Sequence, residues 1–281
     1  PVSFLKCVDH TIEIASAQIK SSIMLAGLYG DSVFKIITPQ SRDHTEIMLN
    51  EFGCNISIDR DYIKMEPGKL ITPNHIEVPG DISSAAFYIV GSIISKDSQI
   101  KIENVGLNPL RTGFIKILEM MGANIQILNK RTINGELIGD IYTESSTLNG
   151  IEIPKELIAS SIDELPLIVL AASQANGKTS IRNAEELRVK ESDRISSMIN
   201  MMDGFKISTD EYSDGMNVYG GSIQASRVNS FGDHRIAMTA LMASLVSDGD
   251  ILVEDCKNID TSFPTFIETA NNIGMDIKKN D

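Results

Sequence analysis

The 281-residue sequence contains no tryptophan, and aromatic residues make up only 5% of it. No apolar run approaches the roughly 18 residues that a membrane-spanning helix needs. Its three cysteines, Cys7, Cys54 and Cys256, are an odd number without metal-ligand spacing, and its four histidines form no zinc motif. The sequence therefore predicts a protein without a metal site or a membrane span, and its thiols fit the reducing cytoplasm.

Cations are the scarcer charged class, since 25 Lys and Arg against 38 Asp and Glu give a net charge of −13. A nucleic-acid partner is not expected, because binding phosphate chains needs a broad basic surface. Small anionic ligands remain compatible with this charge if the few cations converge in one cleft. The apolar content of 42% is typical of a globular chain that is long enough for one large domain or two ordinary ones.

The densest group of charges is residues 185–194, with seven ionisable side chains in ten positions. Apolar residues follow at helical spacing and predict a helix that begins near Val189, with Lys190 and Arg194 on one face and Glu191 beside them. Two cations at a helix N-terminus are opposed by the helix dipole unless an anion lies between them. The pattern indicates an anion site beside a carboxylate, and a solvated helix start with ion pairs is the alternative that spacing alone leaves open.

A degenerate repeat organises the chain, because a helix, a glycine and a short strand occur together four times. Each group follows a helix rich in small and apolar residues and a strand, so the predicted unit is βαβαββ. The glycines, expected where a helix closes in the left-handed conformation, are Gly53, Gly122, Gly204 and Gly274. The first helices, predicted to be buried, span 16–28, 83–94, 164–175 and 234–246. The second helices span 46–52, 114–121, 192–203 and 266–273.

A segment rich in helix and strand breakers separates the first repeat from the other three. Residues 65–74 contain prolines and a glycine, and Pro79 and Gly80 follow, which makes this the best place for a hinge. We predict an α/β fold with one repeat in residues 1–78 and three in residues 79–281. If repeats are grouped in threes, two further repeats precede the first, and the chain is expected to be a fragment.

Six motifs rich in polar and charged residues occur along the chain: SAQIKS (16–21), SRDHTE (41–46), SIDE (161–164), EELRVKESDR (185–194), DHRIAM (233–238) and TSFP (261–264). They stand in the order found in the 5-enolpyruvylshikimate-3-phosphate synthase (3-phosphoshikimate 1-carboxyvinyltransferase) family. The resemblance covers essentially the whole chain and is closest to the bacterial class often described as glyphosate-insensitive. Six ordered motifs are more specific than one, so they disfavour a plain ion-pair interpretation of Lys190 and Arg194.

The resemblance implies the enolpyruvyl transferase fold, an inside-out α/β barrel. Members have two domains, each with three βαβαββ repeats around a pseudo-threefold axis, and their substrates bind in the cleft between the domains. The four repeats here would be the last of the N-terminal domain and all three of the C-terminal domain, with roughly the first third of the usual polypeptide absent. We therefore expect no useful turnover by residues 1–281 alone, and weak, salt-sensitive binding of the anionic substrates.

The implied reaction transfers the enolpyruvyl group of phosphoenolpyruvate to the 5-hydroxyl of shikimate-3-phosphate and releases phosphate, in the shikimate pathway of aromatic amino acid biosynthesis. It needs protonation of the enol carbon, removal of the hydroxyl proton and cations that hold the negative charges, with no cofactor or metal. By its motif, Asp163 is the expected proton acceptor. An N-cap role for Asp163 before the helix at 164–175 is compatible with that function. Glu191, with Lys190 close by, is expected to transfer the proton at the enolpyruvyl carbon.

The resemblance also implies the residues that bind the two substrates. Guanidinium groups suit phosphoenolpyruvate, because they fork onto carboxylate or phosphate and never lose their charge. The expected phosphoenolpyruvate ligands are Gln18, Arg194 and Arg235. The expected shikimate-3-phosphate ligands are Ser16, Ala17 (through its backbone), Gln18, Arg42, Asp163 and Lys190.

Simpler roles compete with several of these assignments. As the simpler alternatives, Ser16 and Gln18 serve as helix caps alone, and Arg235 forms an ion pair with Asp233 alone. Thr261 stands where other members carry a lysine that touches phosphoenolpyruvate, so that contact is not expected. His234 is expected to be structural.

Two alternative functions stay open. UDP-N-acetylglucosamine enolpyruvyl transferase shares the fold and the phosphoenolpyruvate chemistry, although the charged string at 188–194 and the context of Asp163 favour the shikimate enzyme. A non-catalytic anion-binding fragment is the other alternative. For the intact enzyme we expect small-molecule substrates as the only partners, neither nucleic acid nor membrane, and a monomer.

Overall fold

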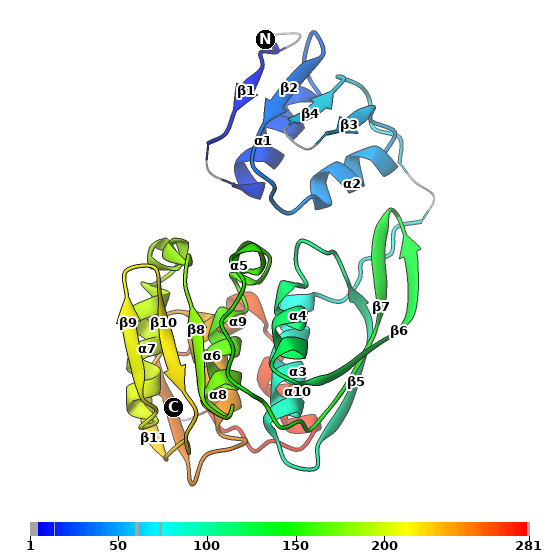
Figure 1. The fold of residues 1–281 in the computed structure, drawn as a ribbon. Helices are drawn as coiled ribbons and strands as arrows, with labels where there is room; N and C mark the ends of the chain where they lie inside the picture. The colour runs from blue at the N-terminus through cyan, green and yellow to red at the C-terminus, as the bar shows by residue number, and fades with distance from the viewer. Residues whose placement is uncertain (1–4, 14, 60–61, 73–74, 280–281) are drawn as a thin grey trace. The chain divides into compact units, whose positions relative to one another are not determined.

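The computed structural model describes residues 5–13, 15–59, 62–72 and 75–279 (Figure 1). Helices and strands alternate along the chain, and the predicted α/β class is confirmed. The chain divides into two compact parts, which we name the first and the second lobe. The first lobe comprises Pro1–Pro79, Gly106–Leu110 and Lys130–Ile138, and the second comprises Gly80–Val105, Arg111–Asn129 and Gly139–Asp281.

The first lobe contains one complete βαβαββ repeat. Its elements are β1 (His10–Thr11), α1 (Ala17–Gly27), β2 (Phe34–Ile37), α2 (His44–Glu51), β3 (Ile56–Ile58) and β4 (Tyr62–Met65). The sheet has the order β1-β2-β4-β3, with β1 parallel to β2 and the other pairs antiparallel. Met24, Phe34 and Met65 lie in its small apolar core. Gly27 lets α1 approach β2 closely, because a Cβ there would lie 2.2 Å from the Phe34 ring.

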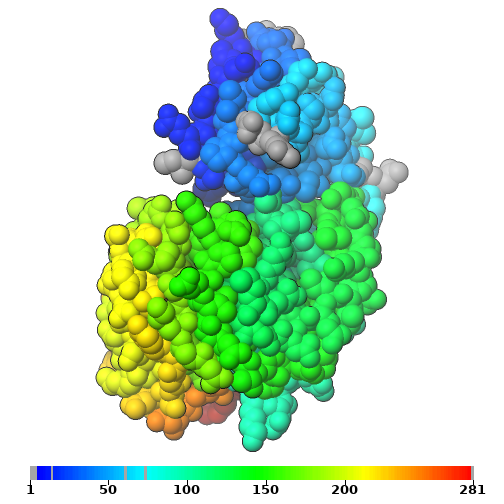
Figure 2. All heavy atoms as spheres, viewed as in Figure 1, coloured from blue at the N-terminus to red at the C-terminus, as the bar shows by residue number. Residues whose placement is uncertain are grey.

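The second lobe contains three further repeats, and side chains fill the spaces between its ribbons (Figure 2). The first comprises α3 (Ile82–Ile94), β5 (Gln99–Gly106), α4 (Gly113–Met120), β6 (Asn124–Ile133) and β7 (Glu136–Glu144). The second comprises α5 (Lys155–Ser161), α6 (Leu165–Ser173), β8 (Lys178–Ile181), the 3₁₀ helix η1 (Glu185–Val189), α7 (Arg194–Gly204), β9 (Thr209–Tyr212) and β10 (Gly215–Tyr219). The third comprises β11 (Ser226–Asn229), α8 (His234–Ala243), β12 (Ile251–Glu254), α9 (Ile259–Ser262) and α10 (Phe266–Asn272).

The closing hairpins pair in the same way in three repeats. β4 lies between β2 and β3, β7 lies between β5 and β6, and β10 lies between β8 and β9. The prediction of a closing strand after the last helix is wrong, because within the described part of the chain no strand follows α10. The backbone of Ile277 is satisfied by a side chain instead: its N–H donates to Asn271 Oδ1, and Asn271 Nδ2 donates to its carbonyl.

The first helices of the repeats in the second lobe form its core. Helices α3, α6 and α8 contact one another, and the predicted burial is confirmed for all nine residues of α6. Most residues of α3 and α8 are buried as well. The same prediction is wrong for α1, of which only Lys20, Met24 and Gly27 are buried. Among the described residues of the first lobe, α1 is the first helix of the only repeat, so no equivalent helix packs against it as α3, α6 and α8 pack against one another.

The helix-closing glycines follow the prediction at three of four positions. Gly53, Gly122 and Gly274 have positive φ values of 84°, 101° and 113°. At the third position α7 continues through Gly204, and Lys206 takes the left-handed conformation with φ 64°. The helix there therefore ends one residue later than predicted.

The breaker-rich segment contains neither helix nor strand over residues 66–72 and 75–79. Pro73 and Asn74, which belong to the predicted hinge, lie outside the described residues. The tip of the β6–β7 hairpin groups with the first lobe rather than with residues 79–281. There, Glu136 pairs with His44, and Asn134 Oδ1 accepts from the Glu77 N–H. A search of the described helices finds none that is long and apolar enough to cross a membrane.

Candidate active site

Three helix N-termini meet in the second lobe, because α6, α7 and α8 contact one another and their first residues interact. Asp163 lies just before α6, Arg194 is the first residue of α7, and Arg235 is the second residue of α8. A helix N-terminus carries partial positive charge and unsatisfied N–H groups. Three such termini with two arginines form a place where negative charge is stabilised.

The two arginines converge on one carboxylate. Arg194 Nη1 lies 3.6 Å from Asp163 Oδ1, and Arg235 Nη2 lies 3.6 Å from Asp163 Oδ2. Arg235 Nη1 also donates to the Asp163 carbonyl at 2.9 Å. The two guanidinium groups, which come from different repeats, are thus close enough to share one small anion.

Arg194 is among the largest fully buried side chains, with 1% of its surface exposed. Its Nε donates to Asp233 Oδ2 at 2.8 Å, and its Nη2 donates to Glu191. Burial by itself would raise the pKa of Asp233, but the hydrogen bond and charge of Arg194 and the N–H of Arg235 outweigh burial and lower that pKa. Arg194 is therefore anchored from below by Asp233, which is fully buried, and covered on its outer edge by Glu191, whose side chain is 51% exposed.

The prediction of a helix that begins near Val189 is wrong. Residues Glu185–Val189 form a 3₁₀ helix, and Lys190 then adopts an extended conformation. α7 begins only at Arg194, because Asp193 caps it by accepting from the Ser196 N–H at 3.1 Å. Lys190 consequently does not share a helix face with Arg194, and its ammonium group pairs with Glu186.

Two of the simpler roles are also wrong. Asp163 is not the N-cap of α6, since Glu164 holds that position and makes no side-chain capping bond. The Arg235 guanidinium contacts Asp163 and Glu164, whereas the Asp233 carboxylate binds Arg194 and accepts from the Arg235 backbone N–H. The side chains of Asp163 and Arg235 are therefore directed at the charged cluster.

His234 begins α8 next to these groups. Burial lowers its pKa, and the positive charge of Arg235 adds to that effect. The imidazole is accordingly held towards its neutral form. Within the described chain, no group of His, Cys, Asp or Glu could hold a metal ion.

The first lobe holds the other predicted binding residues, and they are joined by a buried ion pair. Ser16 caps α1 by accepting from the Ile19 N–H, and Ala17 and Gln18 are the first residues of that helix. Arg42 precedes α2. Lys20 and Glu46, to which the sequence assigned no role, pair at 2.5 Å with side-chain exposures of 3% and 2%.

Lys20 connects the two motifs of the first lobe. Its Nζ donates to the carbonyls of Ser41 and Arg42 at 3.3 and 2.8 Å. Lys20 therefore fixes the loop that carries Arg42 to the helix that begins with the predicted ligands. The sequence signal that could have identified Lys20 is a lysine within an otherwise apolar helix. The corresponding signal for Glu164 is a glutamate directly before the apolar helix α6.

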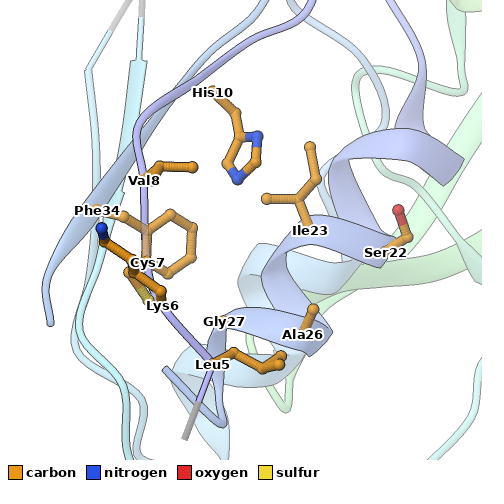
Figure 3. A pocket seen from close by; sticks show the side chains of 10 residues that line it. All are labelled: Leu5, Lys6, Cys7, Val8, His10, Ser22, Ile23, Ala26, Gly27 and Phe34. Atoms are coloured by element: carbon orange, nitrogen blue, oxygen red, sulfur yellow. The ribbon is translucent and has the colours of Figure 1, made fainter. Parts of the chain in front are cut away.

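A pocket of about 260 Å³ in the first lobe lies between the segment around Cys7 and helix α1 (Figure 3). Leu5, Val8, Ile23 and Phe34 contribute to its mainly apolar lining. It contains none of the residues predicted to bind substrates, and its chemistry does not suit small polyanions.

Residues 3–270 match the family described as EPSP synthase (3-phosphoshikimate 1-carboxyvinyltransferase). A 3-phosphoshikimate 1-carboxyvinyltransferase from Hydrogenovibrio crunogenus is 43% identical over 285 residues, which cover 99% of this chain and 64% of that protein. The chain therefore spans less than two thirds of the length of that relative.

Two solved structures share the fold. The structure of EPSP synthase from Acinetobacter baumannii matches with a TM-score of 0.94 and 39% identity, over 99% of this chain and 65% of that chain. The enolpyruvyl transferase NikO from Streptomyces tendae matches with a TM-score of 0.75 and 16% identity, over 96% of this chain and 65% of that chain. The predicted enolpyruvyl transferase fold is confirmed.

Proposed function

The chain belongs to the EPSP synthase (3-phosphoshikimate 1-carboxyvinyltransferase) family, and we propose that it carries a large part of the active site of such an enzyme. The proposed reaction joins phosphoenolpyruvate to the 5-hydroxyl of shikimate-3-phosphate and releases phosphate. The observation that supports this function best is the convergence of Arg194 and Arg235 on Asp163 at three helix N-termini.

Phosphoenolpyruvate is proposed to bind where Glu191 now covers Arg194. Arg194 keeps its buried anchor on Asp233, while the exposed Glu191 carboxylate can be displaced by a substrate carboxylate or phosphate. Arg235 offers its Nη2 edge to the same anion. Displacement also frees Glu191 for proton transfer, so binding and the start of the chemistry would be coupled.

Asp163 is proposed to accept the proton of the 5-hydroxyl while that oxygen forms a bond to C2 of phosphoenolpyruvate. In the same step Glu191, with Lys190, supplies a proton to C3, which takes up the electron pair of the C2–C3 double bond. When the C2–O bond to phosphate breaks, C3 returns one proton to the Glu191 carboxylate, because the product keeps the enol double bond. Arg194 and Arg235 stabilise the negative charge that collects on the leaving phosphate.

The first lobe is proposed to bind shikimate-3-phosphate through Ser16, the Ala17 backbone, Gln18 and Arg42, and to reach phosphoenolpyruvate through Gln18. The capping role of Ser16 leaves its hydroxyl able to donate, since the cap uses it as an acceptor. Monomeric state, cytoplasmic location, a domain boundary near residue 78 and membership of the glyphosate-insensitive class stay predictions.

A phosphate-release assay tests this proposal. The chain is compared with a joined protein, which adds the part of the Hydrogenovibrio crunogenus relative that it does not match, expected to lie on the N-terminal side. We expect the joined protein to release phosphate with phosphoenolpyruvate and shikimate-3-phosphate, and the chain alone to be inactive. Release with UDP-N-acetylglucosamine instead would contradict the proposed substrate, and full activity of the chain alone would contradict the expected need for further repeats.

A further inference from the structure

Glu164 is a buried carboxylate next to the proposed site, and neither the sequence motifs nor the proposed chemistry gives it a role. Only 1% of its surface is exposed, and it forms no capping bond to α6. Its Oε1 lies 3.5 Å from Arg235 Nη1 and accepts a hydrogen bond from the Ser83 hydroxyl. Glu164 therefore connects α6 with α8 and α3.

Arg111 lies behind this contact. Its Nη2 donates to Ser83 Oγ, and it lies 3.5 Å from Asp81, the N-cap of α3. The Ser83 hydroxyl can accept from Arg111 and donate its own proton to Glu164 at the same time. A continuous chain of contacts thus runs from Arg111 through Ser83 and Glu164 to Arg235.

This series of contacts fixes the Nη1 edge of the Arg235 guanidinium, whereas its Nη2 edge has only the longer contact of 3.6 Å to the Asp163 carboxylate. Nη1 is held by the Asp163 carbonyl and the Glu164 carboxylate, while Nη2 faces the Asp163 carboxylate. Arginine loses much conformational freedom when it binds an anion, and a partner that orients it beforehand reduces that loss. Contacts at Nη1 therefore orient the Arg235 guanidinium before an anion binds at Nη2.

Folding stability does not account for a carboxylate at this position. Burial raises the pKa of Glu164 more than the charges of Arg235 and Arg111 and the Ser83 hydrogen bond lower it. A carboxyl group whose ionised form is disfavoured in the folded state weakens folding at neutral pH. Groups that oppose stability in this way are concentrated at functional sites.

We propose that Glu164 is a positioning residue for Arg235, and that Ser83 and Arg111 hold it in the orientation that presents Arg235 Nη2 to the bound anion. The assignment of phosphoenolpyruvate as that anion rests on the proposed function. The positioning itself concerns any small phosphate-bearing ligand of Arg235.

The kinetic test uses the joined protein and Glu164→Gln, which keeps an acceptor for Ser83 and removes the charge. We expect KM for phosphoenolpyruvate to rise about tenfold, as for one charge-assisted hydrogen bond, with KM for shikimate-3-phosphate changed less than about twofold. Ser83→Ala should raise the same KM by a smaller factor. Asp140→Asn is the matched control, because Asp140 is a buried acid whose partner Lys101 lies on β5.

The binding test uses the 281-residue chain and inorganic phosphate, so it does not depend on turnover. Phosphate is titrated while the Arg235 Nε–H signal is followed by NMR. Glu164→Gln should raise the dissociation constant for phosphate about tenfold, whereas Asp140→Asn should leave it unchanged. Equal phosphate affinity of wild type and Glu164→Gln would overturn the positioning role, as would equal losses in Glu164→Gln and Asp140→Asn. A joined protein that binds phosphate as expected but shows no turnover would contradict the proposed function and leave the positioning role supported.

Discussion

Helices α1 and α6 hold the same place in their repeats and meet different surroundings. All nine residues of α6 are buried, and it contacts both α3 and α8. Eight of the eleven residues of α1 are not buried, including Ile19 and Leu25, which are 52% and 51% exposed. A repeat therefore folds its own sheet, but its first helix becomes a core helix only when the first helices of other repeats pack against it.

The same contrast extends to the apolar surface of each lobe. Most of the exposed large apolar side chains among the described residues lie in the first lobe, although it is the smaller one. The mainly apolar pocket beside α1 belongs to this surface. The second lobe, by comparison, combines a closed helical core with a charged cluster at the N-termini of α6, α7 and α8.

The largest difference between the lobes should be catalytic. In the joined protein, Asp163→Asn should lower kcat by about two to four orders of magnitude, because a positioned proton acceptor is lost. Gln18→Ala in the first lobe should mainly raise KM, by roughly tenfold, since it removes a hydrogen bond to substrate. Steady-state phosphate release measures both. Near-normal turnover of Asp163→Asn would show that Asp163 is not the proton acceptor.

Among the described residues, each lobe contains one fully buried ion pair, Lys20–Glu46 in the first and Arg194–Asp233 in the second. Replacing the cation leaves a buried carboxylate unpaired, which costs about 3–5 kcal/mol. Lys20→Met should therefore expose amides of the first lobe alone, and Arg194→Met should expose those of the second. Amide hydrogen exchange, read by mass spectrometry, distinguishes them, with Lys278→Met on an exposed pair as control. Simultaneous loss of protection in both lobes would show that they unfold as one unit.

Matched leucines measure the different burial of the first helices. Leu170→Ala in α6, which is fully buried, should cost about 2–5 kcal/mol of the free energy of unfolding. Leu25→Ala in α1 should cost about 0.5 kcal/mol or less in the 281-residue chain. In the joined protein the cost of Leu25→Ala should rise. Urea unfolding gives these values, and a large cost of Leu25→Ala in the chain alone would contradict the exposure of α1.

Two buried carboxylates of the second lobe should respond to pH in opposite directions. The Asn129 amide, the Asn104 N–H and Lys101 lower the pKa of Asp140 from 3.8 to about 2, whereas burial raises the pKa of Glu164 above 4.5. Asp140 thus stabilises the fold above pH 3.8, and this contribution is lost as the pH falls towards 2. The Glu164 carboxyl group holds its proton more tightly in the folded state than in the unfolded state, so its contribution to folding stability becomes unfavourable as the pH rises above 4.5.

The variants make this difference measurable by urea unfolding across a pH series. The destabilisation caused by Asp140→Asn should shrink at the acidic end. Glu164→Gln, which has no proton to lose, should become more stable relative to wild type as the pH rises. Parallel pH profiles of the two variants would show that the pKa shifts do not differ in sign.

Local patterns in the sequence predicted most helices and strands of the four repeats, although not the absence of a strand after α10, because apolar periodicity and glycine positions are local signals. They failed where a neighbour or a cap decides. Because Asp193 caps α7, the helix begins only at Arg194, and Lys190 lies outside it and does not share a helix face with Arg194. The exposure of α1 depends on which helices pack against it, which its own apolar sequence does not specify.

The candidate site was predictable only in part for the same reason. Ordered motifs identified Asp163, Arg194 and Arg235, and the structure brings these three together. The motifs also contained Glu164 and Lys20, but their roles depend on Ser83 and on the carbonyls of Ser41 and Arg42, which are distant in sequence. Contacts of this kind become visible only once the chain is folded.

Binding of one anion by Arg194 and Arg235 can be observed directly from their Nε–H signals by NMR. The Arg194 signal should be well protected, because its Nε donates to the buried Asp233, and Arg→Lys variants assign both signals. When phosphoenolpyruvate is titrated into the 281-residue chain at low salt, both signals should shift with one common midpoint, and added salt should weaken the binding. If neither signal shifts, or if the two shift with different midpoints, the two arginines do not form one anion site.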